Sequence, residues 1–130
     1  MMKSGGSFIV LMSFAVARCG MINLGAIAAA KTGVAGLALS AAATCARYNI
    51  RAGCVALGLT RTPLTQALNE NEASLRFSAT LHPLGRIGEP DEVACAMRWF
   101  LSPEQSWVTG QVLAVDGGLS SLHARVTSNP

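Results

Sequence analysis

Short apolar runs that alternate with helical stretches constrain the fold of this chain more than any other feature. Residues 8–12 form a continuous apolar run, which is typical of a strand buried on both faces and therefore of a parallel sheet. Residues 24–47, dense in Ala, Leu and Gly, predict a long helix, and residues 50–57 predict a second strand. A helix opening at Glu89 and a strand over residues 111–115 follow. This order predicts an α/β fold, a parallel sheet of about three strands with flanking helices.

The remaining segments are predicted to connect these strands and helices or to form the chain end. Residues 13–24 are expected to form a loop before the long helix. Residues 59–84 are polar and irregular, with short helical pieces predicted after Pro63 and around residues 70–81, so this segment is interpreted as a lid or binding loop. Residues 120–130 are expected to form a flexible tail.

The chain is unusually apolar for its size. Hydrophobic residues make up 51% of the sequence and charged residues 13%, against a usual charged share of about 25%. The 24–47 helix is apolar nearly all round, so it is expected to be buried nearly all round. One face can pack on the sheet, and we hypothesise that the other packs on a helix of another subunit.

Charge and cysteine patterns exclude several function classes. The basic residues behind the net charge of +3 are scattered and are not interleaved with aromatics, so no nucleic-acid partner is expected. The four cysteines lack C-x-x-C spacing and the two histidines are far apart, so no metal site is expected. Idle or buried thiols indicate a reducing, cytoplasmic location, while a disulfide framework stays open if the chain is secreted.

The N-terminal residues 1–17 partly resemble a secretory leader, with Ala15-Val16-Ala17 as a candidate cleavage site. Against this interpretation, Gly5-Gly6 occupy the place of the positively charged segment. We also expect no apolar run long enough to span a bilayer, and therefore no membrane partner.

Six short motifs occur in order along the chain. They are Gly5-Gly6-Ser7, Ala28-Ala29-Ala30-Lys31, Tyr48-Asn49-Ile50-Arg51, Gly58-Leu59-Thr60-Arg61-Thr62-Pro63, His82-Pro83-Leu84-Gly85-Arg86-Ile87-Gly88-Glu89-Pro90, and Val108-Thr109-Gly110-Gln111 with Val115-Asp116-Gly117-Gly118. In this order and spacing they resemble the short-chain dehydrogenase/reductase (SDR) family over residues 5–119. The resemblance implies a partial Rossmann-like fold, with residues 1–119 as one domain.

A glycine-rich turn in the family's first half holds the pyrophosphate of NAD or NADP. Neither G-x-x-x-G-x-G nor G-x-G-x-x-G follows a strand in this sequence, and Gly5-Gly6 precede the first strand. The resemblance therefore implies the carboxyl half of an SDR domain, with the N-terminal βαβ nucleotide-binding half missing. A strand left with an open edge agrees with a missing neighbour.

The family transfers a hydride between a nicotinamide and a carbonyl or alcohol, and a tyrosine in Y-x-x-x-K moves the proton. By resemblance Lys31 takes the place of that lysine, but Ile27 stands where the tyrosine belongs. The single tyrosine, Tyr48, lies about 25 Å from Lys31 along a helix. The family's serine aligns with Phe14, and Ser13 is the candidate substitute, although a one-residue slip in a strand turns a side chain to the other face.

By resemblance the cofactor contacts are Lys31, Gly58, Leu59 and Thr62. The alternative is that the last three only shape their loop and that Lys31 is a surface lysine whose stem lies on apolar atoms. Elsewhere, His82 is interpreted as a capping or surface histidine. Asp116 is expected to stabilise the turn at Gly117-Gly118, and no metal ligands are assigned.

These observations leave three hypotheses. The first is an SDR-like oxidoreductase homologue that is catalytically inactive as this chain, a pseudoenzyme that binds NAD or NADP weakly at best. The second is a non-catalytic interaction module, which forms a homo-oligomer or assembles with a full-length SDR relative through the 24–47 helix and the C-terminal strand. The third is a fragment or truncated gene product. The sequence names no substrate.

Overall fold

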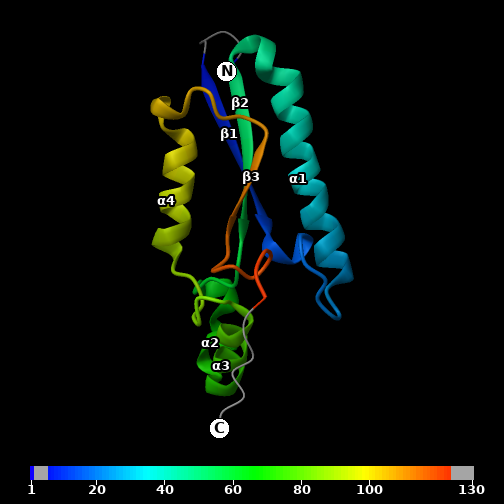
Figure 1. The fold of residues 1–130 in the computed structure, drawn as a ribbon, viewed down its shortest axis with the longest axis vertical. Coiled ribbons are helices and arrows are strands. Elements are labelled where there is room, and N and C mark those ends of the chain that lie inside the picture. The colour runs from blue at the N-terminus through cyan, green and yellow to red at the C-terminus, as the bar shows by residue number, and fades with distance from the viewer. Residues whose placement is uncertain (2–5, 124–130) are drawn as a thin grey trace.

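The fold is a thin parallel sheet covered by a helix on each face (Figure 1). The structure, a computed structural model, describes residue 1 and residues 6–123. Within them, β1 (Ser7–Phe14), β2 (Ile50–Leu57) and β3 (Gln111–Val115) pair in parallel in the order β1-β2-β3. The α/β fold with about three parallel strands is therefore confirmed.

The two long helices lie on opposite faces of the sheet. Helix α1 (Gly25–Cys45) connects β1 to β2 and is extended by a 3₁₀ turn, η2 (Ala46–Tyr48). Helix α4 (Pro90–Leu101) covers the other face, with Pro90 in its first turn as predicted. A further 3₁₀ turn, η4 (Pro103–Gln105), leads from α4 towards β3.

The apolar core lies between α4 and the sheet. Phe100 and Val55 are completely buried, and Val93 is nearly so. The ring of Phe100 stacks on that of Phe8 with 5.2 Å between centroids. On the α1 face the buried side chains are small, because alternate β2 residues Ala52, Cys54 and Ala56 meet a helix whose own buried residues are Ala38 and Ala42.

The guanidinium of Arg51, on β2, holds the segment after α4 against the sheet. It lies 4.5 Å from the ring centroid of Phe8. It also donates hydrogen bonds to four backbone carbonyls, those of Phe100, Ser102, Gln105 and Val108. The end of α4 and the entry to β3 therefore share one positively charged anchor, because helix C-terminal carbonyls favour a cation.

Two expectations about β1 are corrected. Residues 13–14 belong to the strand and not to the following loop, which begins with a 3₁₀ turn, η1 (Ala15–Ala17). The strand is also not buried on both faces, since Met12 is 42% exposed and Ser13 is its one fully buried residue. The reason is position, because β1 lies at the edge of the described sheet and pairs there with β2 alone.

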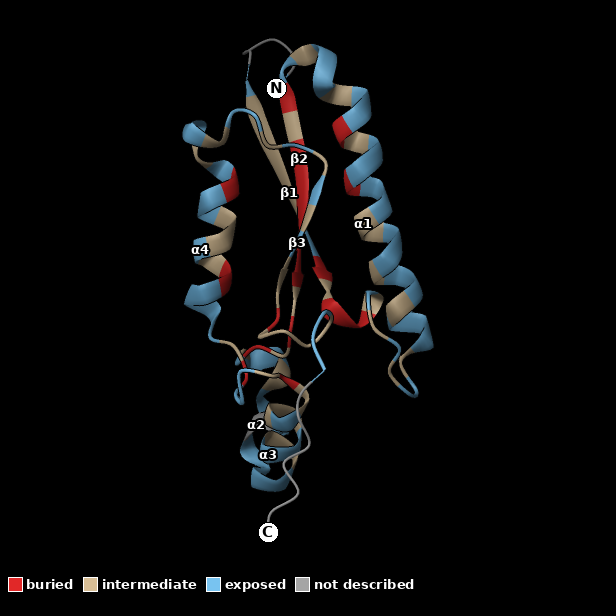
Figure 2. Cartoon of the chain, in the orientation of Figure 1, coloured by how far each residue is buried: buried red, intermediate tan, exposed pale blue. Residues whose placement is uncertain are grey.

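Helix α1 is likewise less buried than its composition predicted. Its sheet-facing side carries the buried residues, whereas the outer side is exposed, with Leu37 61% and Leu39 48% accessible (Figure 2). By length and composition alone, Gly25–Tyr48 would pass as a membrane span, contrary to the expectation that no run was long enough. That test is weak evidence, since a helix that packs along a sheet also passes it.

The segment 59–84 has the short helical pieces that its sequence predicts. They are η3 (Pro63–Thr65), α2 (Gln66–Glu70) and α3 (Glu72–Leu81), and they lie beyond the carboxyl ends of the strands (Figure 1). We call residues 59–84 the lid segment. Of the predicted tail, residues 124–130 lie outside the described residues, whereas the backbone of Leu122 still bonds to Gly118.

Candidate functional site

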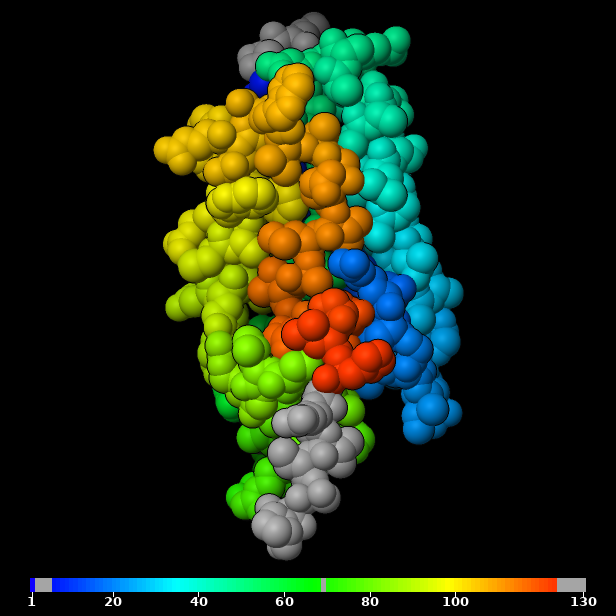
Figure 3. Space-filling view, viewed as in Figure 1, coloured from blue at the N-terminus to red at the C-terminus, as the bar shows by residue number. Residues whose placement is uncertain are grey.

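The carboxyl ends of the three strands form one edge of the sheet. Phe14, Leu57 and Val115 are register partners, so the residues that follow each strand emerge side by side. Ligands of open α/β sheets bind beyond this edge. Figure 3 shows that the segment after β1 and the segment after β3, distant in sequence, lie next to each other on the surface. Arg18, in the segment after β1, also donates a hydrogen bond to the carbonyl of Val112 on β3.

Ser13 and Lys31 are brought together at this edge. The Ser13 hydroxyl, 2% exposed, donates a 2.7 Å hydrogen bond to the backbone carbonyl of Lys31 on α1. Ser13 therefore faces α1, and the next residue, Phe14, points to the opposite side of the strand.

The buried thiol of Cys54, on β2, lies near the same two residues. Burial raises the pKa of the Cys54 thiol, while a hydrogen bond to Ser13 and the charge of Lys31 act in the lowering direction.

Ile27 lies one helical turn before Lys31 and is 46% exposed. Its place on α1 follows from helix geometry, so its side chain shares the face of Lys31. An isoleucine has no proton to exchange. The groups at this edge are therefore Lys31, the buried hydroxyl of Ser13 and the hydrocarbon side chain of Ile27.

The loop after β2 packs closely against the end of β3 and against His82. The Gly58 N–H donates to the Val115 carbonyl at 2.9 Å. A Cβ atom on Gly58 would lie 2.8 Å from both the Cα of Asp116 and the Nε2 of His82, so its missing side chain is explained by close approach. The Leu59 N–H donates to the same Nε2 at 3.1 Å.

Thr62 acts as a helix cap in this structure. Its N–H donates to the Oγ1 of Thr65 at 3.0 Å, and the two hydroxyl oxygens are 3.2 Å apart. The Thr65 hydroxyl in turn donates to the carbonyl of Thr60. Pro63 follows as the first residue of η3. Threonine before proline is thus accounted for by local helix initiation.

His82 is buried, which corrects its interpretation as a surface histidine. It is 3% exposed and terminates α3, so the capping role is correct in position. Its Nε2 accepts the Leu59 N–H, and its Nδ1 lies 2.7 Å from the Ser78 carbonyl. Sequence reasoning missed this link, because the partner Leu59 lies 23 residues earlier.

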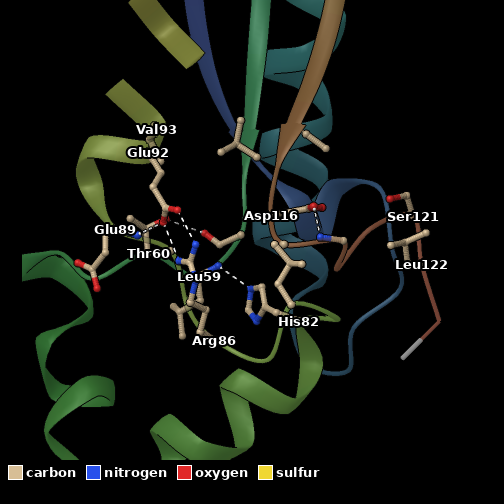
Figure 4. Close-up of a pocket in the computed structure, with 17 residues that line it drawn as sticks. Leu59, Thr60, His82, Arg86, Glu89, Glu92, Val93, Asp116, Ser121 and Leu122 are labelled. Atoms are coloured by element: carbon tan, nitrogen blue, oxygen red, sulfur yellow. Dashed lines mark hydrogen bonds and ion pairs between the residues drawn. The ribbon is translucent and has the colours of Figure 1, made fainter. Parts of the chain in front are cut away.

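A cavity of about 460 Å³ opens beside His82 (Figure 4). It lies between the exit of β2, the end of the lid segment, the start of α4 and the turn after β3. Its walls combine apolar side chains with charged ones, among them Leu59, His82, Arg86, Glu92, Val93 and Asp116.

The charged groups around this cavity are paired. Arg86 holds both carboxylate oxygens of Glu92, at 2.8 and 2.5 Å. Hydrogen bonds from Arg86 and from the Glu89 N–H lower the pKa of Glu92 to about 2. Arg61 pairs with Glu89 at 3.1 Å. Among the described residues, no group of three or more His, Cys, Asp or Glu is placed to hold a metal ion.

Asp116 stabilises the turn after β3, as predicted. Its carboxylate accepts hydrogen bonds from the N–H groups of Gly118 and Ser120, both at 2.9 Å, and from the Ser120 hydroxyl. Gly117 and Gly118 adopt φ values of 58° and 90°, which favour glycine. Burial raises the pKa of Asp116, but these hydrogen bonds outweigh it and hold the pKa below its usual value.

Comparisons with known proteins match this fold and these motifs. The family described as enoyl-(acyl carrier protein) reductase matches residues 1–120. A 3-oxoacyl-[acyl-carrier-protein] reductase, FabG, of Thermotoga maritima is 40% identical over 119 residues, which cover 92% of this chain and 48% of the relative. The structure of a short-chain type dehydrogenase/reductase from Mycobacterium ulcerans superposes with a TM-score of 0.87 at 34% identity, covering 92% of this chain and 44% of that one.

This chain belongs to the short-chain dehydrogenase/reductase family. It spans about half the length of the curated relatives it matches. Another similar SDR structure is a gluconate 5-dehydrogenase from Burkholderia cenocepacia J2315 in complex with NADP and tartrate, with a TM-score of 0.87 and 31% identity, covering 94% of this chain and 48% of that one. The SDR family generally binds NAD or NADP.

The loop after β2, with Gly58, Leu59 and Thr62, fits such a nucleotide poorly in this conformation. The backbone donors of Gly58 and Leu59 are both used inside the protein, and the hydroxyl of Thr62 is engaged with Thr65. The space over Gly58 is filled by His82 and Asp116. Contacts from Lys31, Gly58, Leu59 and Thr62 to a cofactor therefore stay a prediction from the family, and the loop would have to rearrange for Gly58, Leu59 and Thr62 to make them.

Proposed function

We propose that the polypeptide of these 130 residues is an SDR pseudoenzyme that does not transfer hydride by itself. The observation that carries the proposal is Ile27, which lies one turn before Lys31 on α1, where the family's proton-transferring tyrosine belongs. A phenol beside a lysine moves a proton at neutral pH, whereas a hydrocarbon has none to move.

Neither neighbouring group supports a substitute chemistry. Tyr48 ends the 3₁₀ turn after α1, about 25 Å along the helix from Lys31. The Ser13 hydroxyl donates its proton to a backbone carbonyl, so it is not directed at a substrate carbonyl in this conformation. Polarisation of a substrate needs a donor aimed at the developing oxyanion.

We propose further that this chain binds NAD or NADP weakly. The family and the NADP-bound B. cenocepacia relative make a nicotinamide nucleotide the ligand to test. Against tight binding, the donors of Gly58, Leu59 and Thr62 are already satisfied within the protein. Each of those hydrogen bonds would have to be exchanged for one to the nucleotide, which removes most of its net contribution.

Calorimetric titration of the purified chain with NADH and NADPH tests this directly. We expect no saturable binding in the micromolar range. Ile27→Tyr should leave the titration unchanged, and Ile27→Phe, which lacks the hydroxyl, is the matched control for ring size. Ile27→Tyr combined with Phe14→Ser should also show no turnover in this chain alone. Micromolar binding by the unchanged chain, or turnover by the double variant, would overturn the proposal.

A second candidate function is assembly, and the exposed side of α1 favours it. Leu37 and Leu39, which flank the sheet-facing row of Ala38 and Ala42 on its two sides, are 61% and 48% exposed on a helix with no acidic residue (Figure 2). An apolar surface of this kind is typical of a contact with another chain. We propose a homo-oligomer, or a complex with a full-length SDR relative, through α1 and the C-terminal strand β3.

Sedimentation velocity over a dilution series tests the assembly. Leu37→Lys should shift the population to monomer, whereas Leu64→Lys, at a site 94% exposed and away from α1, should not. A chain that stays monomeric at high concentration and in the presence of an SDR relative contradicts this candidate function.

A further inference from the structure

Strand β1 has an open edge that faces away from β2. The N–H of Ser7 donates to the carbonyl of Asn49, so Ser7 and every second residue after it bond towards β2. The residues between them direct their N–H and C=O groups to the open side, and they are Phe8, Val10, Met12 and Phe14. Within residues 6–123 no strand pairs with this side of β1. The edge therefore presents a row of backbone donors and acceptors that another strand can use.

The sequence of β1 lacks the features that usually protect an edge strand. Ser7–Phe14 reads SFIVLMSF, with no charged residue, proline or glycine over eight positions. The other edge of the described sheet differs, because β3 is five residues long and Arg18 donates a hydrogen bond to the carbonyl of Val112. A charged group at β3 opposes pairing with a further strand, whereas the longer, uncharged edge of β1 favours it.

Exposed apolar side chains flank the β1 edge on both faces of the sheet. Helix α1 makes a right-handed crossover from β1 to β2 (Figure 1), so the residue before the sheet-facing Ala38 lies on the β1 side of the helix. That residue is Leu37, 61% exposed. On the other face Leu101, 51% exposed, lines a small hollow with Phe8, and Met12, 42% exposed, shares the face of Phe8.

We propose that the open edge of β1 pairs with β1 of a second copy of this chain, antiparallel about a two-fold axis. The two sheets then form one continuous sheet. The register that uses all four outward residues places Leu11 on the axis, Phe8 opposite Phe14 of the second copy, and Val10 opposite Met12 of the second copy. This contact uses β1 and not β3, so it is distinct from the assembly through α1 and β3 and does not depend on nucleotide binding.

The uncharged strand is complementary to itself in this arrangement. A two-fold axis sets each residue of β1 against another residue of the same strand, so a charged edge would repel its own copy. All the outward pairs are instead apolar against apolar. Cross-strand pairs of aromatic and aliphatic side chains stabilise a sheet, and the exposed Met12 would gain cover from the second copy.

The position of α1 also fits the two-fold axis. The Ser13 hydroxyl contacts the carbonyl of Lys31, which fixes the level of the helix along β1. From these two residues Leu37 lies about 9 Å further along α1, and Leu11 lies about 7 Å back along β1. Because α1 runs antiparallel to β1, both displacements have the same direction, so Leu37 lies near the level of the axis. Since α1 packs on both β1 and β2, the two helices would lie about 10 Å apart, which is the spacing of packed helices.

Sedimentation velocity over a dilution series tests the pairing, with circular dichroism to check that each variant folds. We expect a dimer of the unchanged chain and a dissociation constant at least about tenfold higher for Met12→Lys, because the two lysines would be diagonal neighbours across the axis. Leu113→Lys, at a site 38% exposed on β3, is the matched control and should leave the dimer intact. A dimer that survives Met12→Lys but not Leu113→Lys would assign assembly to β3 and overturn the proposal.

Disulfide capture tests the register and does not require Met12→Lys to fold. On the axis the two copies of residue 11 form a non-hydrogen-bonded pair with Cα atoms about 4.5 Å apart, which suits a disulfide. With an added oxidant, Leu11→Cys should join two copies of the tryptic peptide 4–18, which contains no native cysteine. Ile9→Cys, on the same face, should not, since residue 9 lies opposite residue 13.

Two outcomes of the capture experiment contradict the self-pairing. One is equal cross-linking at positions 9 and 11, or none at position 11. The other is a chain that stays monomeric alone and pairs through β1 only with an added SDR relative, which would assign the edge to a strand of that relative.

Discussion

Replacing Gly58 with alanine gives the most informative test of the site geometry. The added methyl would lie 2.8 Å from the Cα of Asp116 and 2.8 Å from the Nε2 of His82. The first is a backbone atom, which cannot move aside as the end of a flexible side chain can. The second is the ring that accepts the Leu59 N–H. Gly58→Ala therefore forces apart the exits of β2 and β3 and strains the histidine contact.

The size of the effect follows from three terms. Overpacking at a buried position costs about 1–3 kcal/mol. Weakening the Leu59 to His82 hydrogen bond costs about 0.5–1.5 kcal/mol. Alanine also lowers the conformational entropy of the unfolded chain relative to glycine, which offsets the loss by about 0.4–1 kcal/mol. The three ranges together give a loss of about 0.5–4 kcal/mol, with a central value of about 2 kcal/mol, in the free energy of unfolding.

Urea unfolding followed by circular dichroism measures this loss, and Gly36→Ala is the control. Gly36 lies in α1, where an added methyl group would meet no other part of the chain within 4 Å, so the same substitution should stabilise the helix by about 0.5–1 kcal/mol. Two identical substitutions are thus expected to have opposite signs. A Gly58→Ala chain as stable as the unchanged one would refute the close approach of His82, Asp116 and Gly58.

Two further predictions concern the core and the turn. Phe100→Ala, at a fully buried ring, should cost about 3–5 kcal/mol in urea unfolding, whereas Phe77→Ala, at a ring 66% exposed, should change little; equal effects would contradict the assigned core. Asp116 has a pKa held below its usual value, so its contribution to stability is full above about pH 4 and is lost as the pH falls through the lowered pKa. Asp116→Asn should therefore flatten the acid side of the stability profile measured by thermal unfolding, and an unchanged acid limb would count against this role.

Hydrophobic patterning predicted the elements well because each strand and helix carries its own local signal. Residues 50–57 form β2 as expected, and the Pro90 region opens α4, since an apolar run and an N-terminal proline act over a few residues. Asp116 was assigned correctly for the same reason, because its partners in the turn lie within four residues.

Burial could not be predicted in the same way, because it depends on which surfaces meet. The composition of α1 indicated burial all round, yet Leu37 is 61% exposed because the described residues place only one layer against the helix. The apolar strand β1 has the open edge that was expected, but it was also expected to be buried on both faces, whereas Met12 is 42% exposed. Composition indicates that a surface would favour burial, but it does not indicate which other part of the protein covers that surface.

The candidate site shows the same division. The spacing of Ile27 and Lys31 follows from the helix period, so the missing phenol was evident from sequence. The engagement of Ser13 with the Lys31 carbonyl depends on how β1 sits against α1, across 18 residues, and His82 reaches Leu59 across 23. Contacts of that range are set by the tertiary fold and carry no local pattern.

Hydride transfer by the purified chain is the measurement that tests the central claim most directly. The chain would be mixed with NADH or NADPH and a panel of ketones and 3-oxoacyl thioesters, beside an active SDR as positive control. We expect no nucleotide oxidation above the buffer rate, because Ile27 cannot supply a proton to the carbonyl oxygen. Turnover by the unchanged chain that is abolished by Lys31→Ala would contradict the account.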